Sequence, residues 1–148
     1  MKPIGYWLNR ADQALTLHMN GMLAEFGLTR LAWQVLNVVQ DGSHVPEARD
    51  VTDAEVVSVL AANGDAPALA AAIDAVLAGG WAARPAPGRL ALTAEGAGRL
   101  ARVAERVGAF RELSMSGISL DEYRTAVSVL ERMTANLEPA RDTDDVTP

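Results

Sequence analysis

Residues 81–96, WAARPAPGRLALTAEG, contain a hairpin signal followed at once by a helix-start signal. Two short segments, residues 81–84 and 89–92, flank the turn sequence Pro-Ala-Pro-Gly and are consistent with a small β-hairpin. Thr93 comes next and can cap a helix, because its hydroxyl can accept a hydrogen bond from a backbone N–H of the first turn. The stretch therefore predicts a hairpin that leads directly into a long helix.

Four helices are predicted before this hairpin. The first covers residues 4–26, where apolar side chains recur every three or four residues, and Gly27 ends it. Thr29 can cap a second, densely apolar helix. The capping box at residues 52–55 opens a third helix, and the fourth, a short helix within residues 65–79, follows an Asn-Gly turn.

Two helices are predicted after the hairpin. The first runs from Thr93 toward Gly117, with apolar residues on one face. A second capping box, at residues 119–122, begins the final helix, which continues to Leu137. The acidic, aperiodic tail at residues 139–148 is expected to be disordered. The sequence thus predicts a mainly α fold with a small β-hairpin.

The amino-acid composition excludes several kinds of functional site. The 148 residues include no cysteine, so disulfides, thiolate metal sites and cysteine nucleophiles are excluded. The net charge of -6 argues against broad affinity for nucleic acid, which depends on lysine and arginine neutralising phosphates. No apolar run is long enough for a membrane span or a signal-peptide core, so we expect a cytoplasmic protein without a membrane partner.

The order of predicted elements resembles the MarR family of bacterial regulators. Three local matches support the resemblance: residues 27–29 before a Trp-containing helix, residues 69–81 in the place of the recognition helix and its exit, and Leu-Thr-Ala-Glu-Gly at residues 92–96. The last is the sharpest, because Leu-Thr followed by Glu-Gly ends the second wing strand in many members. The resemblance covers nearly all of residues 4–137.

This resemblance implies a single domain, residues 1–138, that forms a homodimer. Residues 28–96 would be the winged helix-turn-helix lobe that binds DNA, and residues 4–26 and 97–138 would be the dimerisation helices. Members of the family bind double-stranded DNA, here an operator expected near the chain's own gene. They commonly act as repressors that a small aromatic or amphipathic ligand releases. No enzymatic activity and no cofactor are implied.

In such folds the second short helix enters the major groove, and the hairpin, or wing, contacts the backbone or minor groove. We therefore expect Arg84 and Arg89 of the wing to contact DNA. The alternative for these two arginines is a solvated hairpin whose guanidinium groups keep a proline-rich turn soluble. The expected contacts from the recognition helix are Ala66, Pro67, Ala68, Ala71 and Ala72.

Two features depart from the usual pattern of DNA-reading lobes. The recognition helix has no Arg, Lys, Asn, Gln, Ser or Thr, the side chains that most often read base edges. Residues 52–92 contain two basic and four acidic residues, so this part of the lobe has a net charge of -2. An alternative function is therefore a degenerate winged-helix dimer that serves as a protein-interaction or small-molecule-binding module without sequence-specific DNA binding.

The sequence offers candidates for a ligand site but none for an active site. His18 and Trp33 are candidates to line a ligand cavity between the dimer helices and the lobe, the alternative being that Trp33 is a core anchor and His18 a surface side chain. Asp41, His44 and Glu47 form only a weak metal-site pattern, so no metal is expected. The sequence has no nucleophile elbow, phosphate-binding glycine loop or triad, and we expect no catalysis.

Overall fold

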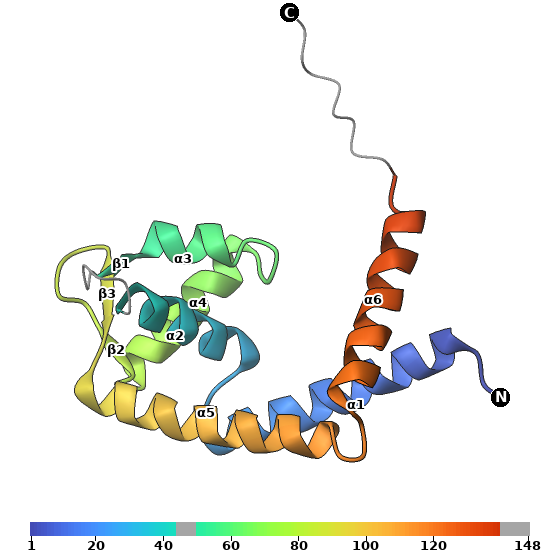
Figure 1. Ribbon diagram of the computed structural model, residues 1–148. Coiled ribbons are helices and arrows are strands. Elements are labelled where there is room, and N and C mark those ends of the chain that lie inside the picture. The colour runs from blue at the N-terminus through green and yellow to red at the C-terminus, as the bar shows by residue number, and fades with distance from the viewer. Residues whose placement is uncertain (44–49, 140–148) are drawn as a thin grey trace, which may run out of the picture. The chain divides into compact units, whose positions relative to one another are not determined.

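The computed structural model describes residues 1–43 and 50–139, and its fold is mainly α with a small antiparallel sheet, as predicted (Figure 1). The elements in chain order are α1 (Ile4–Glu25), α2 (Arg30–Ser43), β1 (Val51–Thr52), α3 (Asp53–Val59), α4 (Ala66–Ala78), β2 (Ala82–Ala83), β3 (Arg89–Leu92), α5 (Ala94–Ser114) and α6 (Leu120–Leu137). None of the helices in these described ranges is both long and apolar enough to cross a membrane.

Helices α2 to α6 each begin at a side-chain cap. Side-chain oxygens of Thr29, Thr52, Asp65, Thr93 and Ser119 each accept a hydrogen bond from a backbone N–H three residues later, at 2.8 to 3.2 Å. Such a cap satisfies a backbone donor that has no partner within the helix. The caps predicted at Thr29, Thr52, Thr93 and Ser119 are confirmed. They could be predicted because a cap depends only on residues within one helical turn.

The sheet has one more strand than the predicted hairpin. Strands β2 and β3 pair antiparallel, and β1 adds to the other edge of β3, where Val51 lies opposite Leu90. The side chains of Val51 and Leu90 are both buried. A strand of two residues has no periodicity of its own, so sequence patterns gave no sign of β1. It connects the wing directly to the start of α3.

Helix α5 ends three residues before the expected position. Its last residue is Ser114, and Gly117 has a φ of +76°, in the turn before α6. The predicted disorder at residues 139–148 falls on residues that, apart from Pro139, lie outside the described ones, as do His44 and Glu47 of the weak metal-site pattern.

The chain divides into two compact units, with the boundary after Phe110, inside α5. The first unit contains the hydrophobic core, built mainly from leucine, valine and alanine of α1 to α5 and the sheet, with Trp81 buried at the start of the hairpin. Helix α6, in the second unit, has no buried residue. The predicted organisation as one domain over residues 1–138 stays a prediction.

Candidate nucleic-acid interface

Helix α4, which covers the residues expected to form the recognition helix, has one buried and one exposed face. Asp65 caps its first turn and Pro67 lies within that turn, which suits a residue that lacks an N–H donor. The buried face packs into the core through Leu69, Ala72, Ile73 and Val76. The exposed positions are Ala66, Pro67, Ala70, Ala71, Asp74, Ala75 and Ala78.

This arrangement corrects the set of expected DNA contacts. Ala72 is only 6% exposed and packs against the core, so it is not on the outer face. Ala68 is half-buried, whereas Ala66, Pro67 and Ala71 are exposed as expected. Consecutive residues of a helix point in directions about 100° apart, so Ala71 and Ala72 cannot share one face.

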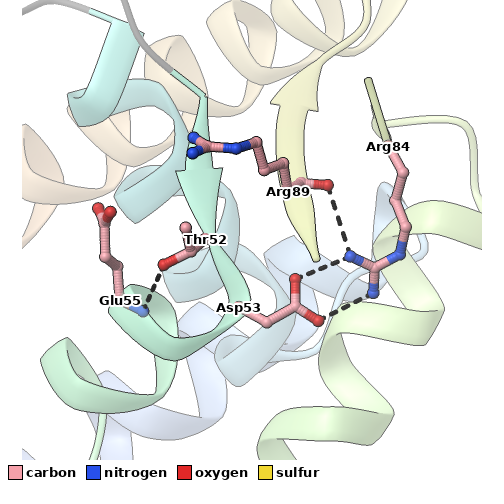
Figure 2. A network of polar contacts seen from close by, with 5 residues as sticks. All are labelled: Thr52, Asp53, Glu55, Arg84 and Arg89. Atoms are coloured by element: carbon pink, nitrogen blue, oxygen red, sulfur yellow. Dashed lines mark hydrogen bonds and ion pairs between the residues drawn. The ribbon is translucent and has the colours of Figure 1, made fainter. Parts of the chain in front are cut away.

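The wing is held to α3 by an ion pair that joins distant parts of the sequence (Figure 2). Two nitrogens of the Arg84 guanidinium donate to the two carboxylate oxygens of Asp53, at 2.8 and 2.9 Å. The same guanidinium donates to the backbone carbonyl of Arg89 at 3.4 Å. The N–H of Asp53 donates to the carbonyl of Gly88 at 3.1 Å, which also fixes the wing turn to the start of α3.

This pairing changes the electrostatics of both groups. The hydrogen bond from Arg84 lowers the pKa of the Asp53 carboxyl, and the same contact raises the pKa of the Arg84 guanidinium. In this bidentate contact, Arg84 donates to the carboxylate with the same pair of N–H groups that arginines often use to bind a phosphate. In this conformation Arg84 holds the wing against the start of α3, and Asp53 neutralises much of its charge.

Arg89 is the wing arginine for which the described part of the chain provides no side-chain partner. Figure 2 shows its guanidinium extending away from the pair formed by Asp53 and Arg84. Its side chain makes no hydrogen bond or ion pair with any other residue of ranges 1–43 and 50–139, and it is exposed. Of the two arginines expected to contact DNA, Arg84 is paired with a carboxylate, whereas Arg89 has no carboxylate partner among the described residues.

The base of the wing is joined tightly to the first turn of α5. The Thr93 hydroxyl donates to the carbonyl of Gly80 at 2.7 Å, and the Thr93 N–H donates to the carbonyl of Trp81 at 3.1 Å. Gly96, in the first turn of α5, lies directly against the backbone of Trp81. Together these contacts set the direction in which the hairpin leaves the core.

His18 and Trp33, the residues expected to bind a ligand, do not line the pocket between α1, α2 and α5. A pocket of about 220 Å³ lies between α1, α2 and α5, lined by Asp12, Leu15, Thr16, Met19, Arg30 and Phe110. His18 is exposed and stacks on Phe110, with ring centroids 4.9 Å apart, but neither His18 nor Trp33 lines the pocket. Trp33 is half-buried and packs against the core. Among the described residues, no cluster of histidine and acidic side chains could hold a metal ion.

The ion pair of the wing predicts a measurable pH dependence. Because the pKa of Asp53 is lowered below its ordinary 3.8, the ionised carboxylate stabilises the fold above that value, and this contribution disappears as the pH falls through the lowered pKa. Asp53→Asn should therefore lower Tm at pH 7 by about 2 °C, the scale of a partly exposed pair, with the difference shrinking toward pH 3. Thermal unfolding followed by circular dichroism at several pH values measures it.

The control for this experiment is Asp121→Asn. Asp121 is also in the first turn of a helix, α6, but no residue in the described part of the chain forms an ion pair with its carboxylate. Its replacement removes the same charge from a helix N-terminus without removing a guanidinium partner. Equal Tm changes for the two variants at pH 7 would show that the pair with Arg84 adds nothing to stability.

Comparison with known proteins places the fold. No protein-family model matches the chain, and no curated protein sequence matches it. A mutant of MarR from Escherichia coli in complex with operator DNA is 22% identical, with a TM-score of 0.68 over 88% of this chain and 93% of that one. A MarR family protein of Mycobacterium tuberculosis in complex with DNA is 22% identical, with a TM-score of 0.67 over 90% and 98% of the two chains.

A third similar structure is the transcriptional repressor CouR bound to p-coumaroyl-CoA. It is 22% identical, with a TM-score of 0.69 over 89% of this chain and 91% of that one. In each case about nine tenths of this chain is covered. The chain therefore has the winged helix-turn-helix fold of the MarR family of transcriptional regulators.

Proposed function

We propose that this protein is a homodimeric regulator of transcription that binds duplex DNA, acting as a repressor in the cytoplasm. The observation that carries the proposal is the geometry of the lobe, in which the exposed face of α4 and the exposed guanidinium of Arg89 belong to the two elements that contact DNA in winged-helix proteins. Two similar structures are complexes with DNA, which supports the same role here. The operator is proposed to lie near the chain's own gene.

The apolar surfaces of the terminal helices support dimerisation. In α1 the side chains of Ile4, Trp7, Leu8, Leu15 and Leu17 are all at least 40% exposed. In α6 the exposed apolar side chains are Leu120, Tyr123, Val127, Met133 and Leu137. Monomeric proteins rarely expose so many large apolar groups on whole helices, so a partner surface is needed. We propose that a second copy of the chain covers them.

A small ligand is proposed to control DNA affinity. The pocket between α1, α2 and α5 has an apolar wall, with Asp12 and Arg30 among its lining residues, and it replaces His18 and Trp33 as the proposed ligand site. A ligand that binds better to a dimer whose lobes are wrongly spaced for DNA would shift the population away from the DNA-binding form. CouR, which was crystallised with p-coumaroyl-CoA, is an example of a ligand-binding protein with this fold.

The test of the proposed function is a titration of the purified protein against the DNA upstream of its own gene and against a scrambled duplex. We expect tighter binding to the upstream DNA, with a modest loss of affinity as salt rises, because the lobe contains few basic residues. Fluorescence anisotropy at two salt concentrations provides the measurement. Equal or absent binding to both duplexes would contradict the proposal.

Arg89→Ala is expected to weaken binding to the upstream duplex about tenfold or more. Each dimer would lose two phosphate contacts, so the slope of log affinity against log salt should also become shallower, by about one unit per lost contact. The control is Arg111→Ala, which removes the same charge from an exposed site of α5 outside the lobe. Equal affinities for Arg89→Ala and Arg111→Ala would remove Arg89 from the interface.

One observation favours a second candidate function, a protein-interaction module. The outer face of α4 consists of alanine and proline with Asp74, and the neighbouring Val57 and Val59 of α3 are also exposed. Such a surface offers apolar contact but few hydrogen bonds to base edges. This alternative predicts that the dimer forms normally while neither duplex binds, so the same titration separates the two functions.

A further inference from the structure

The end of α4 and the start of the hairpin meet in a tight turn at Gly79, Gly80 and Trp81. The N–H of Gly80 donates to the carbonyl of Leu77 at 3.2 Å, and the N–H of Trp81 donates to the carbonyl of Val76 at 3.1 Å. Gly80 has a φ of +75°, so these bonds form the Schellman motif that ends many helices. The motif places the buried Trp81 directly between the end of α4 and the start of β2.

Arg99 of α5 contacts both sides of this turn. Its guanidinium carbon lies 3.8 Å from the centroid of the Trp81 ring, a distance at which a cation is attracted to the face of an indole. One of its nitrogens donates to the carbonyl of Gly79, the residue that caps α4, at 2.9 Å. Arg99 therefore joins the end of α4 to the start of the hairpin through a single side chain.

The contact with Gly79 also supplies a charge that α4 itself lacks. The C-terminus of a helix carries partial negative charge, and a nearby cation stabilises it. The last turn of α4 contains no basic residue, so the cation comes from α5, 20 positions further along the chain. A β-carbon built at Gly79 lies 2.8 Å from Cδ1 of Trp81, so the indole packs closely against the same residue that accepts the hydrogen bond from Arg99.

We infer that Arg99 is a positioning residue that fixes the wing relative to α4. A planar guanidinium can lie flat on an indole and donate to a carbonyl at the same time, whereas the ammonium of lysine is a point charge. The proposed interface needs the exposed face of α4 and Arg89 of the wing to meet one duplex together, so a loosely held wing loses affinity because preorganisation is lost. The consequence for DNA binding rests on the proposed function, whereas the spacing of α4 and the wing does not.

The spacing is measured without DNA, by double electron–electron resonance between spin labels on the two elements. Because the chain has no cysteine, Ala70→Cys in α4 and Ala83→Cys in β2, both at exposed positions, take one label each. An excess of unlabelled protein limits the measured distances to pairs within one chain. Arg99→Gln should broaden or shift the distribution of these distances, whereas Arg102→Gln, which changes an exposed arginine of the same helix, should not. An unchanged distribution in Arg99→Gln would overturn the inference.

A titration with the upstream duplex tests the consequence for DNA binding. Arg99→Gln should bind about tenfold or more weakly than Arg102→Gln, which removes the same charge, and the two variants should share one slope of log affinity against log salt. The slope reports phosphate contacts, so a residue that only positions the wing leaves it unchanged. A shallower slope for Arg99→Gln than for Arg102→Gln would make Arg99 a direct phosphate contact and would overturn its positioning role.

Arg99→Lys separates geometry from charge, and it serves as the test if Arg99→Gln does not fold. Lysine keeps the positive charge, but its ammonium cannot lie flat on Trp81 while it donates to Gly79. The affinity for the upstream duplex should therefore fall severalfold at an unchanged salt slope, and the distances between the labels should broaden. Wild-type affinity and spacing in Arg99→Lys would show that charge alone is sufficient, against the inference.

The two measurements distinguish failure of this inference from failure of the proposed function. If the wild-type protein binds no duplex, the proposed function fails, and the label distances alone decide whether Arg99 fixes the wing. If the upstream duplex binds Arg99→Gln and Arg102→Gln equally well, the regulator stands and the positioning role of Arg99 falls.

Discussion

Replacing Gly96 with alanine is expected to destabilise the lobe by more than about 2 kcal/mol, the upper part of the range for overpacking a close contact. A β-carbon built at Gly96 lies 2.6 Å from the carbonyl carbon of Trp81 and 2.8 Å from its Cα, and it is closer still to the carbonyl oxygen. Backbone atoms cannot rotate away as a side chain can. The first turn of α5 must therefore separate from the start of the hairpin.

The matched control is Gly98→Ala, two residues along the same helix. A β-carbon at Gly98 meets no atom within 4 Å, so alanine there should be neutral or stabilise α5 by up to about 1 kcal/mol through its higher helix propensity. Urea unfolding followed by circular dichroism measures both variants. Similar unfolding midpoints for the two alanine variants would contradict the close packing of Gly96 on Trp81.

Replacing Val127 with glutamate in α6 is expected to raise the dissociation constant of the dimer at least about 100-fold. Val127 is 45% exposed in the single chain, in an apolar row with Tyr123 and Leu130 at the spacing of one helical face. A carboxylate placed in a dimer seam would lose its hydration without gaining a partner, and each tenfold loss of affinity corresponds to about 1.4 kcal/mol.

The control for this prediction is Ser128→Glu, which adds the same charge one residue away. Ser128 lies on the polar row of α6 with Asp121, Arg124 and Glu131, so its side chain should stay in water in the dimer. Sedimentation velocity should give about twice the 15.7 kDa chain mass for wild type and Ser128→Glu, and a smaller mass or unfolded protein for Val127→Glu. An intact Val127→Glu dimer would remove α6 from the seam.

The order of the helices could be predicted because the sequence signals that start a helix and define its buried face lie within a few residues of each other. Each helix start depends on a cap within one turn, as at Thr29 and Ser119, and each buried face depends on apolar residues three or four apart. The prediction that both Ala71 and Ala72 contact DNA does not fit the helix, because consecutive residues point in different directions and Ala72 is buried. An alanine gives little indication of whether its position on a helix is buried or exposed, since it is tolerated both in the core and in water.

The sequence by itself determined the helical order, the wing turn, the absence of cysteine chemistry and the acidic charge of the lobe, because these depend on composition or on residues within a few positions of each other. Only the tertiary structure decided that Arg84 is paired with Asp53, that Arg89 has no side-chain partner among residues 1–43 and 50–139, and that Gly96 packs on Trp81. Arg84 and Asp53 are 31 positions apart, and such pairs form only when separate elements pack together, so no local pattern specifies them.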